Sequence, residues 1–113
     1  RVIIFIDHEK RRFVKTLDYL TSPGYLDGPK GRETAGLPVG GPIAVITNMA
    51  VMKFDDQTKE MYLESYYPGI TPREILDNME FNVDVSRATE SIPPSEMELK
   101  ILREKCDPQR LIL

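Results

Sequence analysis

The stretch Val2-Ile3-Ile4-Phe5-Ile6 is the part of the sequence that decides the fold class. These five apolar residues, mostly β-branched, continue without interruption until Asp7. Such runs are typical of strands buried on both faces, as in a parallel sheet that helices cover. We therefore predict a buried strand over residues 2–6. Because it begins at the first residue, we expect its neighbours to come from an upstream part of a longer protein, from another chain or from symmetry.

The segment that follows predicts a loop-rich connection. Residues 13–20 fit helical spacing in part and strand alternation in part, and we favour a strand. Residues 21–41 hold six of the seven glycines and three of the nine prolines, which indicates a long loop with several forced turns. Loops of this length inside a compact domain are usually functional or disordered.

Two further stretches predict strands that pair as a hairpin. Residues 43–54 are rich in β-branched residues, with Asn48 at an interruption, so we expect one bent strand or two short ones. A polar turn over residues 55–60 and an alternating pattern over residues 61–67 complete the signal. Residues 51–67 are thus predicted to form a β-hairpin.

A helix start at residue 71 has three agreeing signals. Thr71 suits the N-cap, Pro72 suits the first helical position, and Glu74 can close a capping box. The helix is predicted to run to about Glu80. Alternating apolar residues over 81–85 then predict a short strand.

The same capping-box spacing recurs at Ser95 and Glu98. It predicts a second helix that ends near residues 107–108, with Met97 and Ile101 on its buried side. The order strand, loop, hairpin, helix, strand, helix predicts an α/β fold, an open and mostly parallel sheet with flanking helices. At 113 residues, we expect one domain spanning 1–113.

The composition restricts the classes of protein that need to be considered. No apolar run approaches the roughly 20 residues that span a bilayer, and a single cysteine excludes an internal disulfide and a zinc site. We expect a cytoplasmic protein without a metal and without membrane association. Residues 1–32 carry seven basic and four acidic residues on a chain of net charge -3, which is compatible with an anionic ligand or partner but does not indicate nucleic acid.

Patterns with catalytic meaning are weak. His8 follows the carboxyl end of the first predicted strand, where α/β proteins place ligands, but a plain polar residue at a strand end is the commoner case. The glycine-rich residues 36–41 could wrap a phosphate, yet they lack a P-loop ending and a dinucleotide fingerprint, so a turn is favoured. No serine has the glycine pattern of a nucleophile elbow, and no acidic residue stands out as a nucleophile.

Four sequence blocks nevertheless resemble one enzyme family in the same order. The most specific is HEKRRFVKTLDYLTSPGYL over residues 8–26, followed by VITNMAVMKF over 45–54, YPGIT over 67–71 with Glu74-Ile75, and Pro93-Pro94. They resemble the β subunit of the glutaconate coenzyme A transferase type, in its C-terminal portion. Asn48 departs from the wider superfamily, which more often has Asp there; either side chain can hydrogen-bond a local turn.

This resemblance implies a fold and a chemistry. The chain would be part of a larger α/β domain, in an oligomeric enzyme that moves coenzyme A between an acyl-CoA and a carboxylic acid. In that family a β-subunit glutamate forms the covalent intermediate, and it lies upstream of the matched blocks. We therefore assign no catalytic residue to this chain, and expect it alone to be inactive. Coenzyme A is a substrate, and no other cofactor is implied.

Three functions remain open on the sequence alone. The first is the coenzyme A transferase, with an α-type subunit or the N-terminal remainder of the same chain as partner. The second is a hydrolase of a CoA thioester or of an activated ring on the same scaffold, and the third is a non-catalytic module that binds a partner subunit. For the first we expect the turn over residues 21–25 to border the substrate site, with Ser22, Gly24 and Tyr25 contacting substrate; the alternative is a purely structural turn with Tyr25 packed over the core.

Overall fold

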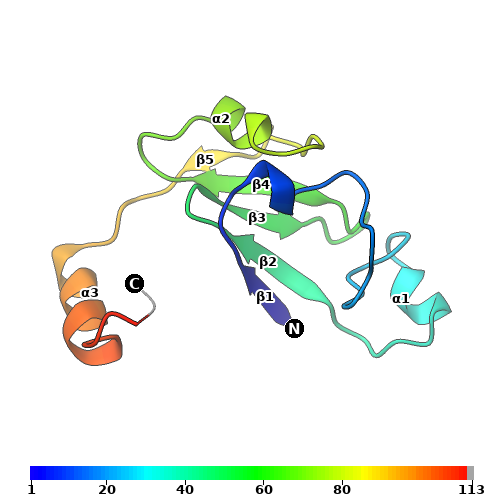
Figure 1. Ribbon diagram of the computed structural model, residues 1–113, viewed down its shortest axis with the longest axis horizontal. Coiled ribbons are helices and arrows are strands. Elements are labelled where there is room, and N and C mark those ends of the chain that lie inside the picture. The colour runs from blue at the N-terminus through cyan, green and yellow to red at the C-terminus, as the bar shows by residue number, and fades with distance from the viewer. Residues whose placement is uncertain (112–113) are drawn as a thin grey trace.

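The fold is built on one open sheet, seen in the computed structural model, which describes residues 1–111 (Figure 1). The strands lie in the order β1-β2-β3-β4-β5. Their bounds are β1 Val2–Phe5, β2 Pro42–Ile46, β3 Ala50–Phe54, β4 Met61–Tyr66 and β5 Thr89–Glu90. β1 pairs with β2 and β4 with β5 in parallel, while the two central pairs are antiparallel. The open α/β sheet with flanking helices is confirmed, with parallel and antiparallel pairs in equal number among residues 1–111.

Short helices flank the sheet or stand away from it. They are the 3-10 turn η1 Lys10–Arg12, α1 Gly31–Thr34, α2 Pro72–Asp77 and α3 Glu96–Ile101, which continues as the π-helical turn η2 Leu102–Cys106. α2 lies beside the sheet, whereas α3 stands apart from it at the end of an extended connection (Figure 1). Within residues 1–111, no helix is long and apolar enough to cross a membrane.

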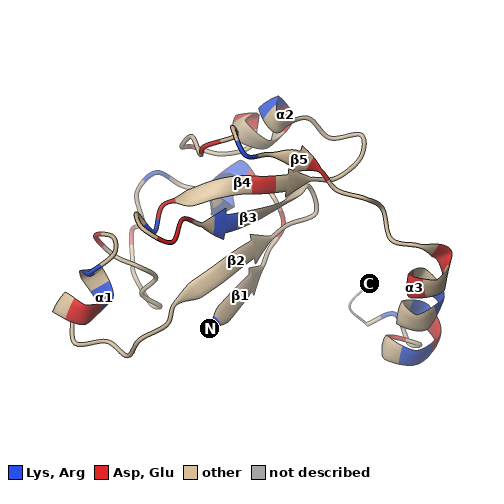
Figure 2. Cartoon of the chain, turned by 180° about the vertical axis from the view of Figure 1, so that it is seen from behind, with Lys and Arg blue, Asp and Glu red and all other residues tan. Residues whose placement is uncertain are grey.

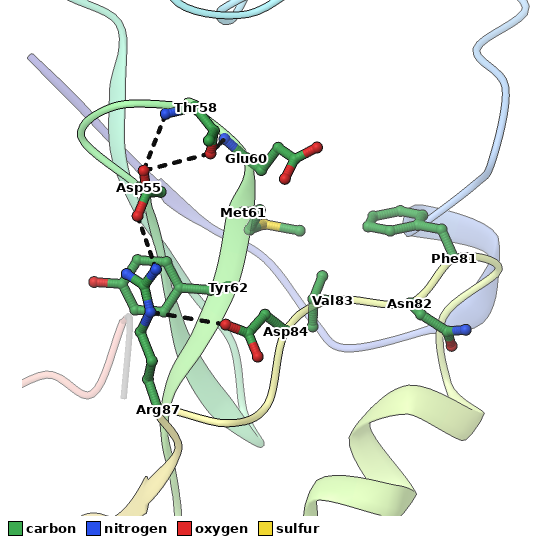
Figure 3. A pocket seen from close by; sticks show the side chains of 10 residues that line it. All are labelled: Asp55, Thr58, Glu60, Met61, Tyr62, Phe81, Asn82, Val83, Asp84 and Arg87. Carbon is green, nitrogen blue, oxygen red and sulfur yellow. Dashed lines mark hydrogen bonds and ion pairs between the residues drawn. The ribbon is translucent and has the colours of Figure 1, made fainter.

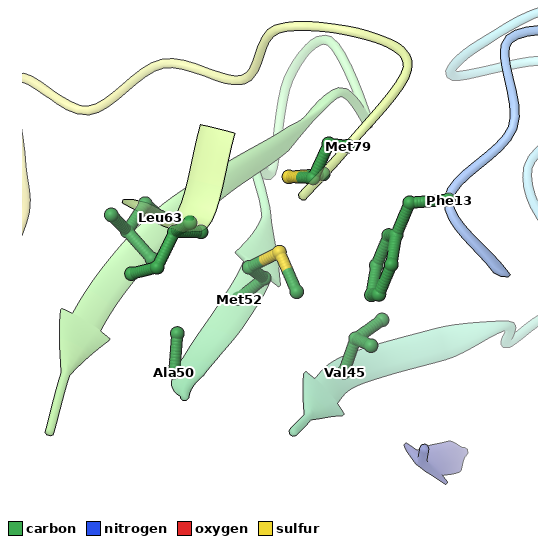
Figure 4. Packing of buried hydrophobic residues seen from close by; sticks show 7 residues of the cluster. Phe13, Val45, Ala50, Met52, Leu63 and Met79 are labelled. Atoms are coloured by element: carbon green, nitrogen blue, oxygen red, sulfur yellow. The ribbon is translucent and has the colours of Figure 1, made fainter. Parts of the chain in front are cut away.

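The core lies between one face of the sheet and α2. Met52, Leu63 and Ile75 are fully buried, and they form one cluster with four further buried side chains, Phe13, Val45, Ala50 and Met79 (Figure 4). Full burial of a side chain of this size contributes about 1.5–3 kcal/mol relative to exposure. Ile75 is the residue that ties α2 to the sheet, because it is the only buried residue within that helix.

Most of the predicted elements are present. Residues 43–54 form two strands separated by a turn at 47–49, and β3 and β4 form the predicted antiparallel hairpin. Both capping boxes are complete, with Thr71 accepting from the Glu74 amide and Ser95 accepting from the Glu98 amide. α2 ends at Asp77 rather than at Glu80.

The prediction of a strand over residues 13–20 is wrong. Phe13 is buried in the core, and its carbonyl accepts a hydrogen bond from the Glu80 amide at 2.8 Å. The Lys15 amide donates to the Glu80 carboxylate at 3.2 Å. These bonds connect the segment to the residues after α2. The backbone there follows an irregular path and pairs with no strand of the sheet.

The predicted strand over residues 81–85 is also wrong. Its only sheet-like contact is a single parallel bridge between Tyr62 and Asp84, supported by the Leu63 amide donating to the Asp84 carbonyl at 2.9 Å. The pairing resumes only at β5, where Thr89 and Glu90 lie beside the end of β4. The loop between these two contacts holds Arg87.

The strand predicted over residues 2–6 is confirmed as β1, and its burial by another part of the protein or another chain stays a prediction, whereas the predicted burial of Met97 and Ile101 is wrong within residues 1–111. The residues of β1 are exposed, Phe5 by 69%, because no other element of residues 1–111 packs over the faces of this edge strand. On α3, Met97 is 73% exposed and Ile101 is also exposed. Within residues 1–111 nothing covers either surface, and neither β1 nor β2 carries a charged residue (Figure 2).

Candidate functional site

The carboxyl end of β1 is connected to the rest of the fold through His8. Its ring is buried, stacked on Phe13 with 4.6 Å between the ring centroids. Nδ1 lies 3.3 Å from the Thr47 hydroxyl, and Nε2 lies 3.0 Å from the Ile75 carbonyl oxygen. A carbonyl oxygen only accepts, so Nε2 carries the proton of the neutral ring, and Nδ1 lies beside the Thr47 hydroxyl, which donates to the Ala50 carbonyl at 3.2 Å.

This environment keeps His8 neutral. Burial lowers the pKa of His8, and the hydrogen bond to the Ile75 carbonyl opposes that shift only in part. Both ring nitrogens are occupied and the ring faces the core. His8 is thus placed as a structural residue that joins β1, the β2–β3 turn and α2.

The turn between β2 and β3 is organised by Thr47. Its hydroxyl accepts from the amides of Met49 and Ala50, both at 3.0 Å. Asn48, which was expected to bond locally, instead accepts from the His8 amide at 2.7 Å through its side-chain oxygen. An aspartate carboxylate would accept the same bond, so this position is compatible with both residues.

The loop over residues 21–41 is held in shape by Arg32. Its guanidinium donates to the carbonyl oxygens of Pro23 and Gly24, both at 3.0 Å, and to that of Pro38 at 3.2 and 3.1 Å. One side chain therefore connects the two sides of the loop. Arginine suits this role because its planar fork presents five donors in fixed directions.

Tyr25 forms the wall of this loop that faces the sheet. Its hydroxyl donates to the Pro42 carbonyl at 2.6 Å, and its ring packs edge-on against Phe54 at 5.3 Å. The Lys59 ammonium lies 5.5 Å from the ring centroid. A Cβ on Gly41 would lie 2.9 Å from the ring, so only glycine fits the observed packing.

The sequence-predicted residues lie in this loop. Ser22 is exposed, Gly24 is half-buried against Pro42, and Tyr25 is half-buried as described. Pro42 begins β2, whereas His8 contacts Thr47 just beyond the other end of β2. Ser22 and His8 therefore belong to opposite ends of that strand. A substrate-contacting role for Ser22, Gly24 and Tyr25 stays a prediction.

A cavity of about 680 Å³ opens beside this loop. Its walls include Arg1, Tyr25, Arg32 and Lys59, together with the glycine-rich residues 36–41. We refer to it as the loop pocket. Sequence reasoning identified the glycine-rich stretch but missed Arg32 and Lys59, because nothing in the local pattern indicates that cations 27 residues apart share a cavity.

A second, smaller cavity of about 430 Å³ lies between β4 and the loop before β5 (Figure 3). Arg87 is held there by ion pairs to Asp55 at 2.8 Å and Asp84 at 3.7 Å, and lies 4.5 Å from the Tyr62 ring centroid. Backbone amides, first that of Thr58, and the Arg87 guanidinium lower the pKa of Asp55. With its only cation paired twice, this cavity is best explained as a structural clamp. Among residues 1–111, no three His, Cys, Asp or Glu side chains are grouped to hold a metal.

Comparison with known proteins places the chain in one family. A family model described as coenzyme A transferase matches residues 1–78. The chain is 50% identical over 107 residues to the B-type subunit of glutaconate CoA-transferase from Acidaminococcus fermentans, covering 94% of this chain and 40% of that protein. The crystal structure of glutaconate coenzyme A-transferase from that organism matches with a TM-score of 0.89 and 48% identity, over 96% of this chain and 42% of that one.

More distant relatives are named for different activities. The B-type subunit of 3-oxoadipate CoA-transferase from Pseudomonas knackmussii is 32% identical over 103 residues, covering 90% of this chain and 40% of that protein. The cholesterol ring-cleaving hydrolase IpdB subunit of Rhodococcus jostii (strain RHA1) is 28% identical over 105 residues, covering 92% and 41%. The crystal structure of IpdAB from Rhodococcus jostii RHA1 matches with a TM-score of 0.75 and 26% identity, over 96% of this chain and 44% of that one.

The chain spans about two fifths of the length of these relatives, with nearly all of its own residues matched. The family model alone covers more than half of the chain, and the fold agrees with that of the solved relative. The chain therefore belongs to the coenzyme A transferase family.

Proposed function

We propose that this chain is part of a coenzyme A transferase that moves CoA between an acyl-CoA and a carboxylic acid. The observation that carries the proposal is the 50% identity to the B-type subunit of a glutaconate CoA-transferase across nearly the whole chain. Coenzyme A would act as a substrate, without a further cofactor. The exposed free thiol of Cys106 favours a reducing, cytoplasmic location.

The role of this segment in such an enzyme would be structural and site-shaping. Several of its glutamates already have structural partners: Glu74 and Glu98 close capping boxes, Glu64 pairs with Lys53, and Glu9 pairs with Arg11. A nucleophilic carboxylate needs access to the substrate, so these residues are poor candidates. We propose that the catalytic glutamate lies outside this chain, and that Ser22, Gly24 and Tyr25 contact substrate.

The exposed apolar surfaces support a partner. β1 offers an unpaired strand edge, and β1 and α3 present large apolar side chains to solvent, including Ile3, Phe5 and Met97. Exposed edges of this kind are usually covered or paired in native proteins. We propose that a further part of the same subunit or an α-type subunit covers them, in an oligomeric enzyme.

A hydrolase on the same scaffold is the second candidate, favoured by the likeness to the IpdB subunit of a cholesterol ring-cleaving hydrolase. An assay of the full-length protein with its partner subunit separates the two. The protein is incubated with a dicarboxylic acyl-CoA, with and without acetate. The transferase produces acetyl-CoA only when acetate is present. Release of free CoA without acetate would support a thioester hydrolase, and formation of neither product is the result expected of a ring hydrolase; both of these results would contradict our proposal.

The predicted contact of the loop with substrate is tested in the same assay. Ser22 is exposed, so Ser22→Leu should leave the melting temperature within about 1 °C, since surface substitutions are usually near neutral. If the loop borders the substrate site, turnover should fall at least about tenfold. Ser86→Leu, at an exposed serine of the loop before β5, is the control for turnover, which should stay as in wild type although the variant loses the side-chain hydrogen bond to Asp84. Unchanged kinetics in the Ser22 variant would make the loop scaffold only.

A further inference from the structure

The carboxylate of Asp55 holds the β3–β4 turn, residues 55–60, with one oxygen and an arginine with the other. Its Oδ1 atom accepts from the amides of Gln57 and Thr58 at 2.9 and 3.0 Å. Its Oδ2 atom accepts from Nη2 of Arg87 at 2.8 Å. Because both oxygens belong to one planar group, the position of Arg87 is transmitted to the turn.

Arg87 is itself anchored to the sheet. Its guanidinium lies 4.5 Å from the Tyr62 ring centroid, and its Nε atom lies 3.7 Å from the Asp84 carboxylate (Figure 3). The carbonyl of Asp84 in turn accepts from the Leu63 amide at 2.9 Å. The side chain of Arg87 is 51% exposed, and exposed ion pairs contribute little to global stability. Its effect is therefore expected in the position of the turn rather than in the stability of the whole fold.

The turn places Lys59 in a conformation that needs support. Its φ angle is +61°, in the left-handed region that residues other than glycine rarely adopt. The Lys59 amide donates to the Asp55 carbonyl at 2.9 Å, and the Asp55 amide donates to the Glu60 carbonyl at 2.9 Å. Strained residues of this kind persist where the surrounding structure fixes them. The conformation of Lys59 thus depends on Asp55 being held in place.

The turn and the residue before it contact the long loop that carries Tyr25. The Lys59 ammonium lies 5.5 Å from the Tyr25 ring centroid, and the Phe54 ring packs against the same ring at 5.3 Å. The Thr58 carbonyl lies beside Gly28, where an added Cβ would be 3.6 Å from the oxygen. A cavity of about 600 Å³ takes its walls from both segments. The position of Tyr25 therefore depends on where the turn lies.

We infer that Arg87 is a positioning residue for the loop that carries Tyr25, acting through Asp55 and the β3–β4 turn. The inference deepens the proposed function and rests on it in one respect, namely that Tyr25 contacts substrate. A loop that is held in place before binding needs less ordering when the substrate arrives. Loss of Arg87 should therefore raise KM, whereas kcat reports the bound state, in which the substrate itself orders the loop, and should change little.

Two variants break the link and keep the turn. Arg87→Gln removes the guanidinium, and Asp55→Asn keeps an Oδ1 acceptor for the turn amides but replaces Oδ2 by an amide NH2, which cannot accept from Arg87. The measurement is hydrogen exchange on the full-length protein with its partner subunit. The reporters are the amides of Gly28 and Gly31, which donate to the carbonyls of Tyr25 and Gly28. Their exchange should increase about fivefold in each variant.

The double variant decides whether the two residues act as one unit. If Arg87 acts through Asp55, exchange in the double variant should equal that in either single variant, because the effects of coupled residues do not add. Arg73→Gln removes an exposed arginine that pairs with Asp77 within α2, so it is the matched control and should leave exchange in the loop as in wild type. Additive effects, or an increase confined to the turn itself, would overturn the inference.

Kinetics with glutaconyl-CoA and acetate, chosen from the name of the 50% identical relative, measure the consequence for the reaction. In Arg87→Gln the KM for the acyl-CoA should rise about fivefold, with kcat within about twofold of wild type. The melting temperature should fall by at most about 3 °C. A purely structural role would reduce the amount of active protein, which lowers kcat and leaves KM unchanged. That pattern would overturn the positioning role.

Failure of this inference and failure of the proposed function give different results. A protein that transfers no CoA would contradict the proposed function, while the exchange measurements would still decide whether Arg87 positions the loop. A protein that transfers CoA, with exchange and KM unchanged in the Arg87→Gln variant, would overturn the inference and leave the proposed function standing.

Discussion

His8 and Ile75 are 67 residues apart in sequence, yet the Nε2 atom of His8 lies 3.0 Å from the carbonyl oxygen of Ile75. The bond joins the end of the edge strand to the helix whose side chain completes the core. Because Ile75 is fully buried and His8 nearly so, the bond is made away from water, where leaving either group unpaired costs about 1–3 kcal/mol. The first prediction rests on this bond.

Replacing His8 by Gln should destabilise the protein at pH 8 and should remove a pH dependence. The pKa of His8 is lowered in the folded state, so between that pKa and about 6.5 the unfolded chain binds more protons than the folded one. The stability of the wild type should therefore decrease as pH falls below about 6.5. Urea unfolding of the full-length protein at pH values from 8 to 5 measures the difference between wild type and variant.

The difference in stability between wild type and the His8→Gln variant should decrease as pH falls. Only the unfolded wild type gains a proton on His8, because the variant has no group there to bind one. The lowered pKa values of Asp55, Asp84 and Glu98 act in the same direction, but only below their ordinary values of 3.8 to 4.5. The range above pH 5 therefore isolates His8. A difference that stays constant or grows with acid would show that His8 is not held neutral by the fold.

The two capping boxes should differ in their effect on global stability. Thr71→Ala removes the cap of α2, whose Ile75 is in the core, and should lower the free energy of unfolding by about 1 kcal/mol. Ser95→Ala removes the identical bond from α3, whose Met97 and Ile101 are exposed. In the 113-residue chain by itself, where α3 stands apart from the sheet (Figure 1), it should leave global unfolding unchanged and increase amide exchange only in α3. The measurements are thermal unfolding and hydrogen exchange, and the two variants control for each other.

An equal loss of stability in both variants of the full-length protein would mean that α3 unfolds together with the sheet. That result would show that something outside the described chain packs α3 onto the body of the protein. It would then support the proposed partner surface, since Met97 and Ile101 are the residues available for that contact.

Arg32→Lys should loosen the loop over residues 21–41 while keeping its charge. An ammonium cannot reproduce the fork of bonds to Pro23, Gly24 and Pro38, so the bridge across the loop is lost. We expect amide exchange in the loop to increase at least about tenfold, which corresponds to about 1.4 kcal/mol of local stability. Arg73→Lys, at a 90% exposed side chain on α2, is the matched control. Unchanged exchange in the loop would show that Arg32 does not hold it.

Local patterns predicted the elements whose interactions are close in sequence. The Thr71 and Ser95 capping boxes span three residues each, and the β3–β4 hairpin is closed by its own turn, so their sequences contain the information needed. The two wrong strand predictions fall where distant contacts decide the path. Phe13 is drawn into the core and bonded to Glu80, and Asp84 meets Tyr62 at a single bridge.

The amino-acid sequence was sufficient to identify the family resemblance. It was also sufficient to locate the apolar, the capped and the turn-forming segments. Only the tertiary structure decided that β1 is an exposed edge, that His8 is a buried link to Ile75, and that Arg1, Arg32 and Lys59 share one pocket with the glycine-rich stretch. The reason is that the interactions differ in how far apart along the chain their partners lie. Caps and turns are made by neighbours along the chain, whereas burial and electrostatic fields depend on distance in space, which the order of residues does not specify.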